Sequence, residues 1–216
     1  VVFGLSGGID SAVVAALAKE AFGKDALGII MPINSLSSDM EDAKLVAESL
    51  KLQNITVDLT EEYNSFISKM QENKNKLAYA NIKPRLRMIV LYYYAQNNNY
   101  LVSGTTNLSE YTIGYSTKYG DSAVDISPLI DLTKTEVLEL ARYLNIPSKI
   151  IEKKPSAGLW EGQSDEDDLG FTYEELDRYI LTGIGEKDLV EKVERMKKIN
   201  NHKKEMPQKF NFRRDI

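Results

Sequence analysis

An apolar run at residues 1–5 passes directly into a glycine-rich turn, and a helical pattern at residues 11–22 follows at once. The adjacent glycines Gly7 and Gly8 let the backbone turn tightly and present its N–H groups to an anion. The first turn of the following helix adds further free N–H donors and the positive end of its dipole. The order strand, glycine-rich turn, helix therefore predicts an anion site at the carboxyl end of a buried strand.

Strand and helix patterns alternate along the rest of the chain. Further short, continuously apolar runs, typical of strands buried on both faces of a parallel sheet, lie at residues 27–31, 55–59, 100–103 and 123–126. Helical spacing covers residues 39–50, 63–71, 84–96, 134–144 and 173–181. The last two helices open with capping boxes, Thr133 with Glu136 and Thr172 with Glu175. We therefore predict an α/β fold: a doubly wound, mostly parallel five-stranded sheet with helices on both faces, formed by residues 1–216 as a single domain.

The composition excludes several classes of site. The 216 residues include no cysteine and one histidine, which rules out disulfides, a thiolate nucleophile, iron–sulfur clusters and Cys-rich or multi-His zinc sites. The formal net charge of −5 argues against a general nucleic-acid partner. No apolar run is long enough to span a bilayer and none resembles a signal peptide, so we expect a cytoplasmic protein with no membrane partner. Because the chain starts in an apolar run without methionine, we also expect that an N-terminal piece is missing.

Two segments differ from the rest in composition. Residues 153–170 combine proline, glycine and serine with an acidic run, and loops of this length are often functional, so we predict a lid over the site there. Trp160 within this segment is either a ligand contact or a local packing anchor. The stretch from Arg195 to Arg214 is basic in an acidic chain, and we expect the tail at 201–216 to face an anionic ligand or surface.

The polar side chains of the first turn suit a phosphate group bound together with a metal ion. Ser6 and Ser11 supply hydroxyl donors, and Asp10 lies where a phosphate-bound Mg²⁺ would take an oxygen ligand. The lysine of a Walker A loop is absent and the spacing differs from the GxGxxG dinucleotide pattern, so transfer of a γ-phosphate is not favoured. The alternative is an ordinary glycine-rich turn whose helix is capped by Asp10.

A second polar turn, residues 103–110, follows the predicted strand at 100–103. In open α/β sheets, sites form beyond the carboxyl ends of strands where the strand order reverses, so the two turns can face each other across a crevice. Glu110 would then complete the Mg²⁺ shell that Asp10 begins. The alternative for Glu110 is a solvated loop carboxylate.

Four motifs in one order resemble a known family. SGGIDS at residues 6–11 resembles the loop of the ATP pyrophosphatases, which split ATP into AMP and pyrophosphate to activate a substrate as its adenylate. With GTTNLSE at 104–110, TKYGD at 117–121 and KPSAGLW at 154–160, the chain resembles the ammonia-dependent NAD synthetases over essentially its whole length. Ser116 and Ser122 depart from that family, where an aromatic residue and a glycine are expected. These departures bear on side-chain packing near the dinucleotide and leave the charged positions untouched.

The resemblance implies an adenine-nucleotide alpha hydrolase-like fold and a set of site residues. The implied catalytic residues are Asp10, Glu110 and Lys134, and Asp10 and Glu110 also hold Mg²⁺, the implied cofactor. The implied ATP contacts are Gly4, Leu5, Ser6, Gly7, Gly8, Ile9, Asp10, Ser11, Thr105, Lys134 and Ser156. The implied deamido-NAD contacts are Arg85, Lys118, Asp125, His202 and Lys203.

Each implied charged contact has a chemical reason and an alternative. Arg85 and Lys118 suit phosphates and a nicotinate carboxylate, and Lys134 can neutralise charge that spreads over the α- and β-phosphates. Asp125 can accept hydrogen bonds from ribose hydroxyls. Alternatively, Lys134 only starts a capped helix, Arg85 belongs to a basic helix start, and His202 lies solvated in the basic tail.

The implied reaction needs no protein nucleophile. The nicotinate carboxylate of deamido-NAD attacks the α-phosphorus of ATP, pyrophosphate leaves, and ammonia attacks the adenylate to give NAD and AMP. Positioning and charge neutralisation then supply most of the acceleration. The chain has no room for an amidase domain, so we expect free ammonia or a separate ammonia-supplying protein as the nitrogen source. Family members are homodimers, which makes a homodimer the expectation here.

Two competing functions stay open at this point. Another ATP pyrophosphatase, such as the amidating half of a GMP synthetase or a tRNA-modifying enzyme, would share the loop, although a tRNA enzyme should show a basic face. The other is a regulatory module that binds ATP without turning it over. The pair Asp10 and Glu110 argues against that module, because binding alone rarely needs two carboxylates for a metal.

Overall fold

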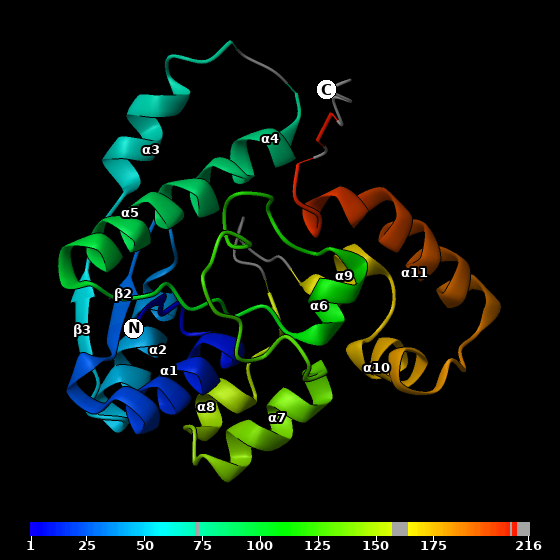
Figure 1. Ribbon diagram of the computed structural model, residues 1–216, viewed down its shortest axis with the longest axis horizontal. Coiled ribbons are helices and arrows are strands. Elements are labelled where there is room, and N and C mark those ends of the chain that lie inside the picture. The colour runs from blue at the N-terminus through cyan, green and yellow to red at the C-terminus, as the bar shows by residue number, and fades with distance from the viewer. Residues whose placement is uncertain (72–73, 157–163, 208, 211–216) are drawn as a thin grey trace, which may run out of the picture.

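The structure is a computed structural model that describes residues 1–71, 74–156, 164–207 and 209–210. A parallel sheet is flanked by helices, which confirms the predicted α/β class (Figure 1). The described strands are β1 (Val2–Gly4), β2 (Leu27–Ile30) and β3 (Gln53–Thr56), in the order β1-β2-β3. In their register, Phe3 lies opposite Gly28, which in turn lies opposite Asn54.

The prediction of five strands was wrong. Within the described residues, the segments predicted as fourth and fifth strands make only isolated parallel bridges, which join Val2 to Val102 and Ser103 to Ile126. The N–H of Val102, which a longer ladder would need, donates instead to the Asp125 carboxylate at 2.8 Å. A side chain takes the place of a strand partner, so the regular ladder ends there. The bridges still place the fourth segment beside β1, on the side away from β2, so the order of the sheet reverses at β1.

Alternate residues of β1 enter two separate hydrophobic cores, because successive side chains of a strand point to opposite faces. Phe3 packs in one core and Val2 in the other. The helices of the first core are α1 (Ile9–Phe22), α2 (Ser37–Ser49), α7 (Lys134–Tyr143) and α8 (Ser148–Ile151). Those of the second are α3 (Thr60–Ile67) and α5 (Ile82–Asn98). The sheet is therefore covered on both faces, as predicted.

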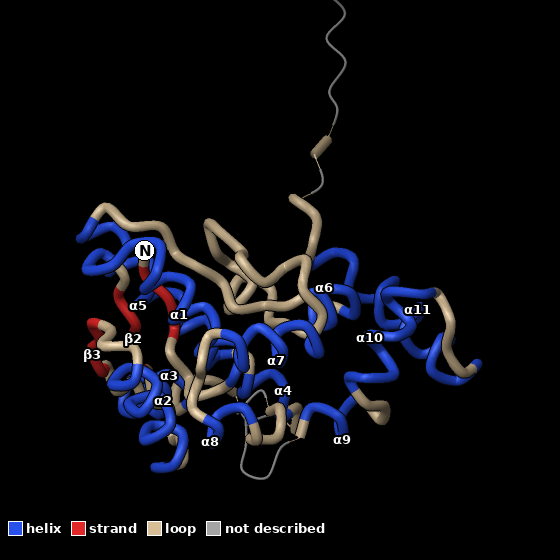
Figure 2. Tube along the Cα trace, turned by 90° about the horizontal axis from the view of Figure 1, so that it is seen from below, coloured by secondary structure: helices blue, strands red, loops and turns tan. Residues whose placement is uncertain are grey.

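A third hydrophobic core lies away from the sheet and includes the buried residues Ile113, Leu176 and Val193. Its helices are α6 (Leu108–Ile113), α9 (Asp165–Leu169), α10 (Tyr173–Thr182) and α11 (Lys187–Asn200). In both views, α10 and α11 form the edge of the molecule opposite the strands (Figure 2). Short helical segments occur at α4 (Lys76–Ala80), η1 (Gly23–Asp25) and η2 (Asn201–Lys203). Among the helices described, none is both long and apolar enough to cross a membrane.

The helices predicted from spacing are present as α1, α2, α3, α5, α7 and α10, and both predicted capping boxes form. The predicted lid at 153–170 is not a loop throughout, because α9 forms within it. The acidic first turn of α9 complements the helix dipole, and Gly170 ends the helix at φ 69°. The part of the predicted lid at 157–163, including Trp160, lies outside the described residues.

Candidate active site

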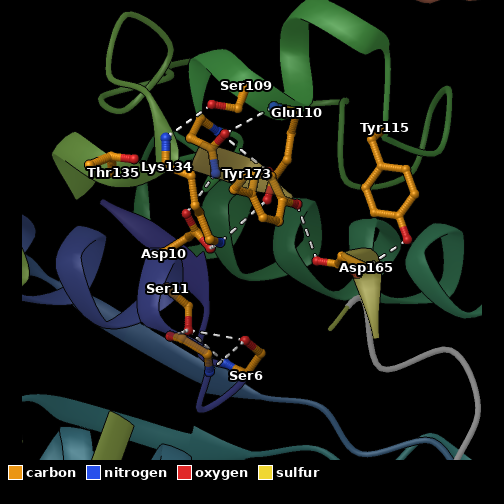
Figure 3. A network of polar contacts seen from close by, with 12 residues as sticks. Ser6, Asp10, Ser11, Ser109, Glu110, Tyr115, Lys134, Thr135, Asp165 and Tyr173 are labelled. Atoms are coloured by element: carbon orange, nitrogen blue, oxygen red, sulfur yellow. Dashed lines mark hydrogen bonds and ion pairs between the residues drawn. The ribbon is translucent and has the colours of Figure 1, made fainter. Parts of the chain in front are cut away.

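The glycine-rich turn, residues 5–8, forms the first part of the site at the carboxyl end of β1. The hydroxyl oxygens of Ser6 and Ser11 lie 3.0 Å apart, and the Ser6 N–H donates to the Ser11 hydroxyl at 3.2 Å. The Gly8 N–H donates to the Ser6 hydroxyl at 3.2 Å, and the Ser11 hydroxyl donates to the Gly8 carbonyl at 2.8 Å. These serines hold the turn in one shape where α1 begins, and a helix N-terminus presents free N–H groups to an anion (Figure 3).

Glycine is required at position 7 of this turn. Its φ is +80°, and a Cβ atom would lie 2.7 Å from the Asp39 carbonyl oxygen and 2.9 Å from the Ala43 nitrogen. Helix α2 therefore packs directly behind the turn. The alternative in which Asp10 caps the helix was wrong, because the N-cap of α1 is Gly8 and the Asp10 side chain points to other partners.

Asp10 forms the centre of the site together with residues from two other elements (Figure 3). Its carboxylate accepts hydrogen bonds from the Lys134 ammonium at 2.5 Å and from the Asn107 amide at 2.9 Å. The same ammonium lies 3.7 Å from the Glu110 carboxylate. Asn107 also accepts the Glu110 N–H at 3.0 Å as the cap of α6, so it contacts both acidic residues. The structure thus brings together the three residues predicted as catalytic, and we call Asp10, Lys134 and Glu110 the charged centre.

Two carboxylates share one ammonium in the charged centre, and the pKa values reflect this imbalance. Burial and the charge of Asp10 raise the pKa of Glu110 to about 8, although Lys134 acts in the opposite direction. Burial on its own lowers the pKa of Lys134, but the charges of Asp10 and Glu110 outweigh it and hold that pKa above its ordinary value. The lysine therefore stays charged, and the centre can accommodate a further cation.

A third carboxylate, Asp165 at the start of α9, lies close to the charged centre (Figure 3). It is buried and accepts hydrogen bonds from the hydroxyls of Tyr115 at 3.1 Å and Tyr173 at 3.2 Å. The Lys134 ammonium lies over the Tyr173 ring, 5.2 Å from its centroid. Burial and the charges of Glu110 and Asp165 raise the pKa of Tyr173, so its hydroxyl remains a hydrogen-bond donor.

The charged centre, together with Tyr115 and Asp165, borders one cavity of about 630 Å³, a size typical of small-molecule sites. The predicted ATP contacts that line it are Gly4, Leu5, Ser6, Gly8, Ile9, Asp10, Ser11, Thr105, Lys134 and Ser156. Glu110 lines the same cavity. All predicted ATP contacts except Gly7 therefore surround a single space.

Comparison with known proteins identifies the family. The sequence profile of NAD synthase matches residues 1–213. The chain belongs to the NAD synthase family. It is 54% identical over 215 residues to the NH(3)-dependent NAD(+) synthetase of Finegoldia magna, covering 99% of this chain and 88% of the relative. It is 56% identical over 209 residues to that of Carboxydothermus hydrogenoformans, covering 95% and 86%.

Solved structures of an NMN synthetase and an NAD synthetase superpose closely on this chain. NMN synthetase from Francisella tularensis matches with a TM-score of 0.94 at 40% identity, covering 98% of this chain and 89% of that one. The NH3-dependent NAD synthetase from Campylobacter jejuni matches with a TM-score of 0.80 at 33% identity, covering 97% and 88%. The described fold is therefore the fold of this family.

Of the residues predicted to bind deamido-NAD in this NAD synthase, Lys203 alone is among those that line the main cavity in the described structure. Its ammonium donates to two carbonyls of the segment after α6, at 2.7 and 2.8 Å. Arg85 donates to the Lys118 carbonyl at 3.2 Å, and Lys118 donates to the His202 carbonyl at 2.5 Å. Arg85, Lys118 and His202 therefore form a row of contacts outside the cavity. This row joins α5 to the tail.

Asp125 lies in a separate, smaller hollow of about 290 Å³. Its carboxylate accepts hydrogen bonds from the Tyr92 hydroxyl at 3.2 Å and from the Val102 N–H at 2.8 Å. Asp125 therefore stabilises the edge of the sheet, and within one chain it does not border the cavity around the predicted ATP contacts.

Three residues around the charged centre, Asn107, Asp165 and Tyr173, were missed by sequence reasoning. Asn107 had a signal, because its spacing to Glu110 is that of a capping box. Asp165 lies in the acidic run of the predicted lid, although that pattern did not indicate its contacts. Tyr173 had no signal, because it reaches the charged centre only through the packing of α10. Local patterns predict where such helices begin, but not which side chains they place near another element.

Proposed function

We propose that this chain converts deamido-NAD to NAD by ATP-dependent amidation with ammonia, through an adenylate intermediate, and releases AMP and pyrophosphate. One observation carries the proposal: the glycine-rich turn and the charged centre border the same cavity, in a chain of the NAD synthase family. Two carboxylates around one buried lysine suit catalysis at a phosphate better than simple retention of ATP. The regulatory-module alternative is therefore disfavoured.

In the proposed reaction, the glycine-rich turn and the N-terminus of α1 bind the phosphates that leave as pyrophosphate. Lys134, held charged beside Asp10, neutralises the charge that builds on the phosphates as the bond to the α-phosphorus breaks. The proton balance requires no general base for adenylation, because the attacking nicotinate carboxylate is already ionised. Positioning of the two substrates in this cavity supplies the remaining acceleration.

Asp10 and Glu110 fit a magnesium ion by the chemistry of their donor atoms. Both offer the hard carboxylate oxygens that Mg²⁺ prefers, and a bound cation would lower the raised pKa of Glu110 and keep that side chain ionised. Mg²⁺ usually binds one or two carboxylates and keeps water and substrate phosphates as its other ligands, so two protein ligands are sufficient. Among the described residues, no group of three or more His, Cys, Asp or Glu side chains could hold a metal. When bound, the ion would offset phosphate charge beside Lys134.

We also propose that the chain forms a homodimer. Residues 1–216 act as one NAD synthetase domain in the cytoplasm, and two copies associate so that the row of contacts from Arg85 to His202 binds deamido-NAD near their boundary. In support, α5 carries Arg85 and also exposes Ile89 by 59% and Tyr93 by 65%, apolar groups that association would cover. Ammonia reaches this site free or from a separate protein.

Product formation tests the proposed function directly. The chain is incubated with Mg-ATP, deamido-NAD and ammonium, and pyrophosphate and NAD are quantified in the same reaction. We expect both products to rise together, and only when all three substrates are present. Pyrophosphate that forms without deamido-NAD would contradict the proposed acceptor. Bound ATP without any pyrophosphate release would contradict the proposed reaction.

A second acceptor is supported by one comparison. The NMN synthetase structure superposes with a TM-score of 0.94, above the 0.80 of the Campylobacter jejuni NAD synthetase. NMN lacks the adenylyl half of NAD, so the corresponding acceptor would be nicotinate mononucleotide. Amidation rates at equal concentrations of the mononucleotide and the dinucleotide decide between them. We expect the dinucleotide to react faster, since the relatives at 54% and 56% identity are NAD(+) synthetases.

A further inference from the structure

Asp177 in α10 is a buried carboxylate that the proposed reaction does not use. It is 3% exposed, it does not line the main cavity, and no described residue forms an ion pair with it. A buried carboxylate without a neighbouring cation is stable only where hydrogen bonds replace its lost hydration. The partners of Asp177 therefore indicate its role.

Both carboxylate oxygens of Asp177 accept hydrogen bonds from other helices. One accepts the hydroxyl of Ser109 in α6. The other accepts the N–H of Thr135 at 2.8 Å and the hydroxyl of the same residue at 2.7 Å, in the first turn of α7. Ser109 in turn accepts the N–H of Lys134 at 3.0 Å, a contact that Figure 3 shows at the start of α7.

These contacts occupy the free N–H groups at the start of α7 one after another. Ser109 accepts the N–H of Lys134, Asp177 accepts that of Thr135, and the cap Thr133 accepts the next one. The first N–H groups of a helix have no partner inside it, and a negative charge there also complements the helix dipole. Asp177 therefore determines where α7 starts relative to α6 and α10.

The residues that Asp177 holds are chain neighbours of the charged centre. Ser109 directly precedes Glu110, and Thr135 directly follows Lys134. We propose that Asp177 is a positioning residue that keeps the Lys134 ammonium between its two carboxylates by holding the starts of α6 and α7 together. Its effect on turnover rests on the proposed function, whereas its effect on the start of α7 does not.

D177N tests this role, because it keeps the side-chain volume while it removes the charge and one acceptor. We expect kcat for NAD formation to fall about 10- to 100-fold, since small displacements of catalytic groups have effects of this size. KM for ATP should change less than kcat, because the glycine-rich turn, which supplies most of the predicted ATP contacts, is not touched. E175A is the matched control: the exposed Glu175 belongs to the capping box of the same helix and contacts neither α6 nor α7. Its kcat should stay within about twofold of the wild type.

Hydrogen exchange gives a readout that does not depend on activity. Amide exchange in the peptide 133–136 should become at least about tenfold faster in D177N and stay unchanged in E175A. Unchanged exchange in D177N, or a kcat equal to that of E175A, would overturn the positioning role. A wild-type chain that makes no NAD would overturn the proposed function instead and leave the exchange result standing.

Variants of Thr135 keep the test decisive if D177N does not fold. T135V removes a single hydrogen bond to Asp177 and should lower kcat about three- to tenfold with KM for ATP retained. T135S keeps both the N–H and the hydroxyl contact, so it should restore kcat to the wild-type value. Equal kcat values for T135V and T135S would contradict the proposal.

Discussion

Asp10 and Glu110 share one ammonium in the charged centre, whereas Asp42 behind the glycine-rich turn has two. Asp42 in α2 is 3% exposed and lies 2.7 Å from both the Lys149 and the Lys153 ammonium groups. We call Asp42 with these two lysines the α2 cluster. The Asp42 carboxylate is buried, but its partner Lys149 is 59% exposed, and Asp39 adds a second carboxylate 2.8 Å from the Lys153 ammonium. Asp42 therefore has two cationic partners, whereas Asp10 and Glu110 have one between them.

The pKa values of the two carboxylates diverge accordingly. Burial and the neighbouring Asp10 raise the pKa of Glu110 to about 8. Burial alone would also raise the pKa of Asp42, but hydrogen bonds from Lys149 and Lys153 outweigh it and lower that pKa. A carboxylate with its own cationic partners needs no ligand to balance its charge, whereas a bound cation would balance the charge of an ionised Glu110 beside Asp10. The raised pKa therefore marks Glu110, rather than Asp42, as a candidate functional group without reference to any motif.

E110Q should show the largest effect. The amide removes a carboxylate that the proposed Mg²⁺ needs, so kcat/KM for NAD formation should fall at least about 100-fold, or about 3 kcal/mol. With a pKa of about 8, Glu110 is mostly uncharged at pH 7 when no cation is bound, so the neutral amide should leave the free energy of unfolding within about 1 kcal/mol of the wild type. Steady-state rates and urea unfolding of one preparation measure both quantities. A clear loss of stability would contradict the charge imbalance described here.

D42N in the α2 cluster should have the opposite effects: a clear loss of stability and little loss of activity. The two lysines would lose their shared carboxylate, although Asp39 still contacts Lys153 at 2.8 Å. The free energy of unfolding should therefore drop by about 2 kcal/mol, less than for a fully buried pair because the Lys149 side chain is 59% exposed. The kcat of the folded protein should fall less than about threefold. If D42N lost activity as severely as E110Q, the two clusters would not differ in function.

G7A tests the contact through which α2 reaches the site. An alanine at φ +80° with its Cβ 2.7 Å from the Asp39 carbonyl oxygen should lower the free energy of unfolding by about 1–2 kcal/mol. G8A is the matched control, because Gly8 has φ −89° and its Cβ would lie 3.4 Å from the Ser6 hydroxyl oxygen, an ordinary van der Waals contact. Thermal unfolding compares the two variants. An equal loss in both would mean that α2 does not constrain the turn.

The smallest predicted effect is on how the free energy of unfolding depends on pH. Because the pKa of Asp42 in the folded chain lies below its ordinary 3.8, its ionised form stabilises the fold fully above about pH 5. That contribution is lost as the pH falls through 3.8 and then through the lower pKa of the folded state. Urea unfolding between about pH 6 and pH 3 should therefore show a steeper decline in the wild type than in D42N. Parallel declines would assign the acid sensitivity to other groups.

The parts of this fold that depend on neighbours in sequence were predictable. The capping boxes at Thr133 and Thr172 locate the starts of α7 and α10, and the glycine-rich turn locates the start of α1. The absence of regular fourth and fifth strands in the described residues was not predictable. The ladder ends where the Asp125 side chain accepts the hydrogen bond of the Val102 N–H. That contact joins groups 23 positions apart, and no local pattern encodes it.

The residues of the site also fall into two groups: those that sequence motifs predict and those that only tertiary packing places there. Asp10, Glu110 and Lys134 lie in recognisable motifs, and the structure places them in contact. Asp165, Tyr173 and Asp177 lie on α9 and α10, helices of the third core, whose position beside the charged centre is a product of tertiary packing. The roles assigned to Arg85, Lys118, Asp125 and His202 stay predictions, because these residues lie outside the cavity of one chain.

The paired hydroxyls of Ser6 and Ser11 have a consequence for the speed of product release. The N–H groups of Ser6 and Gly8 already donate to these hydroxyls, so an arriving phosphate exchanges one set of hydrogen bonds for another. In the proposed reaction, a departing pyrophosphate would likewise leave these two donors satisfied, because they would donate to the serine hydroxyls again. The turn would thereby lower the barrier to dissociation of the proposed product.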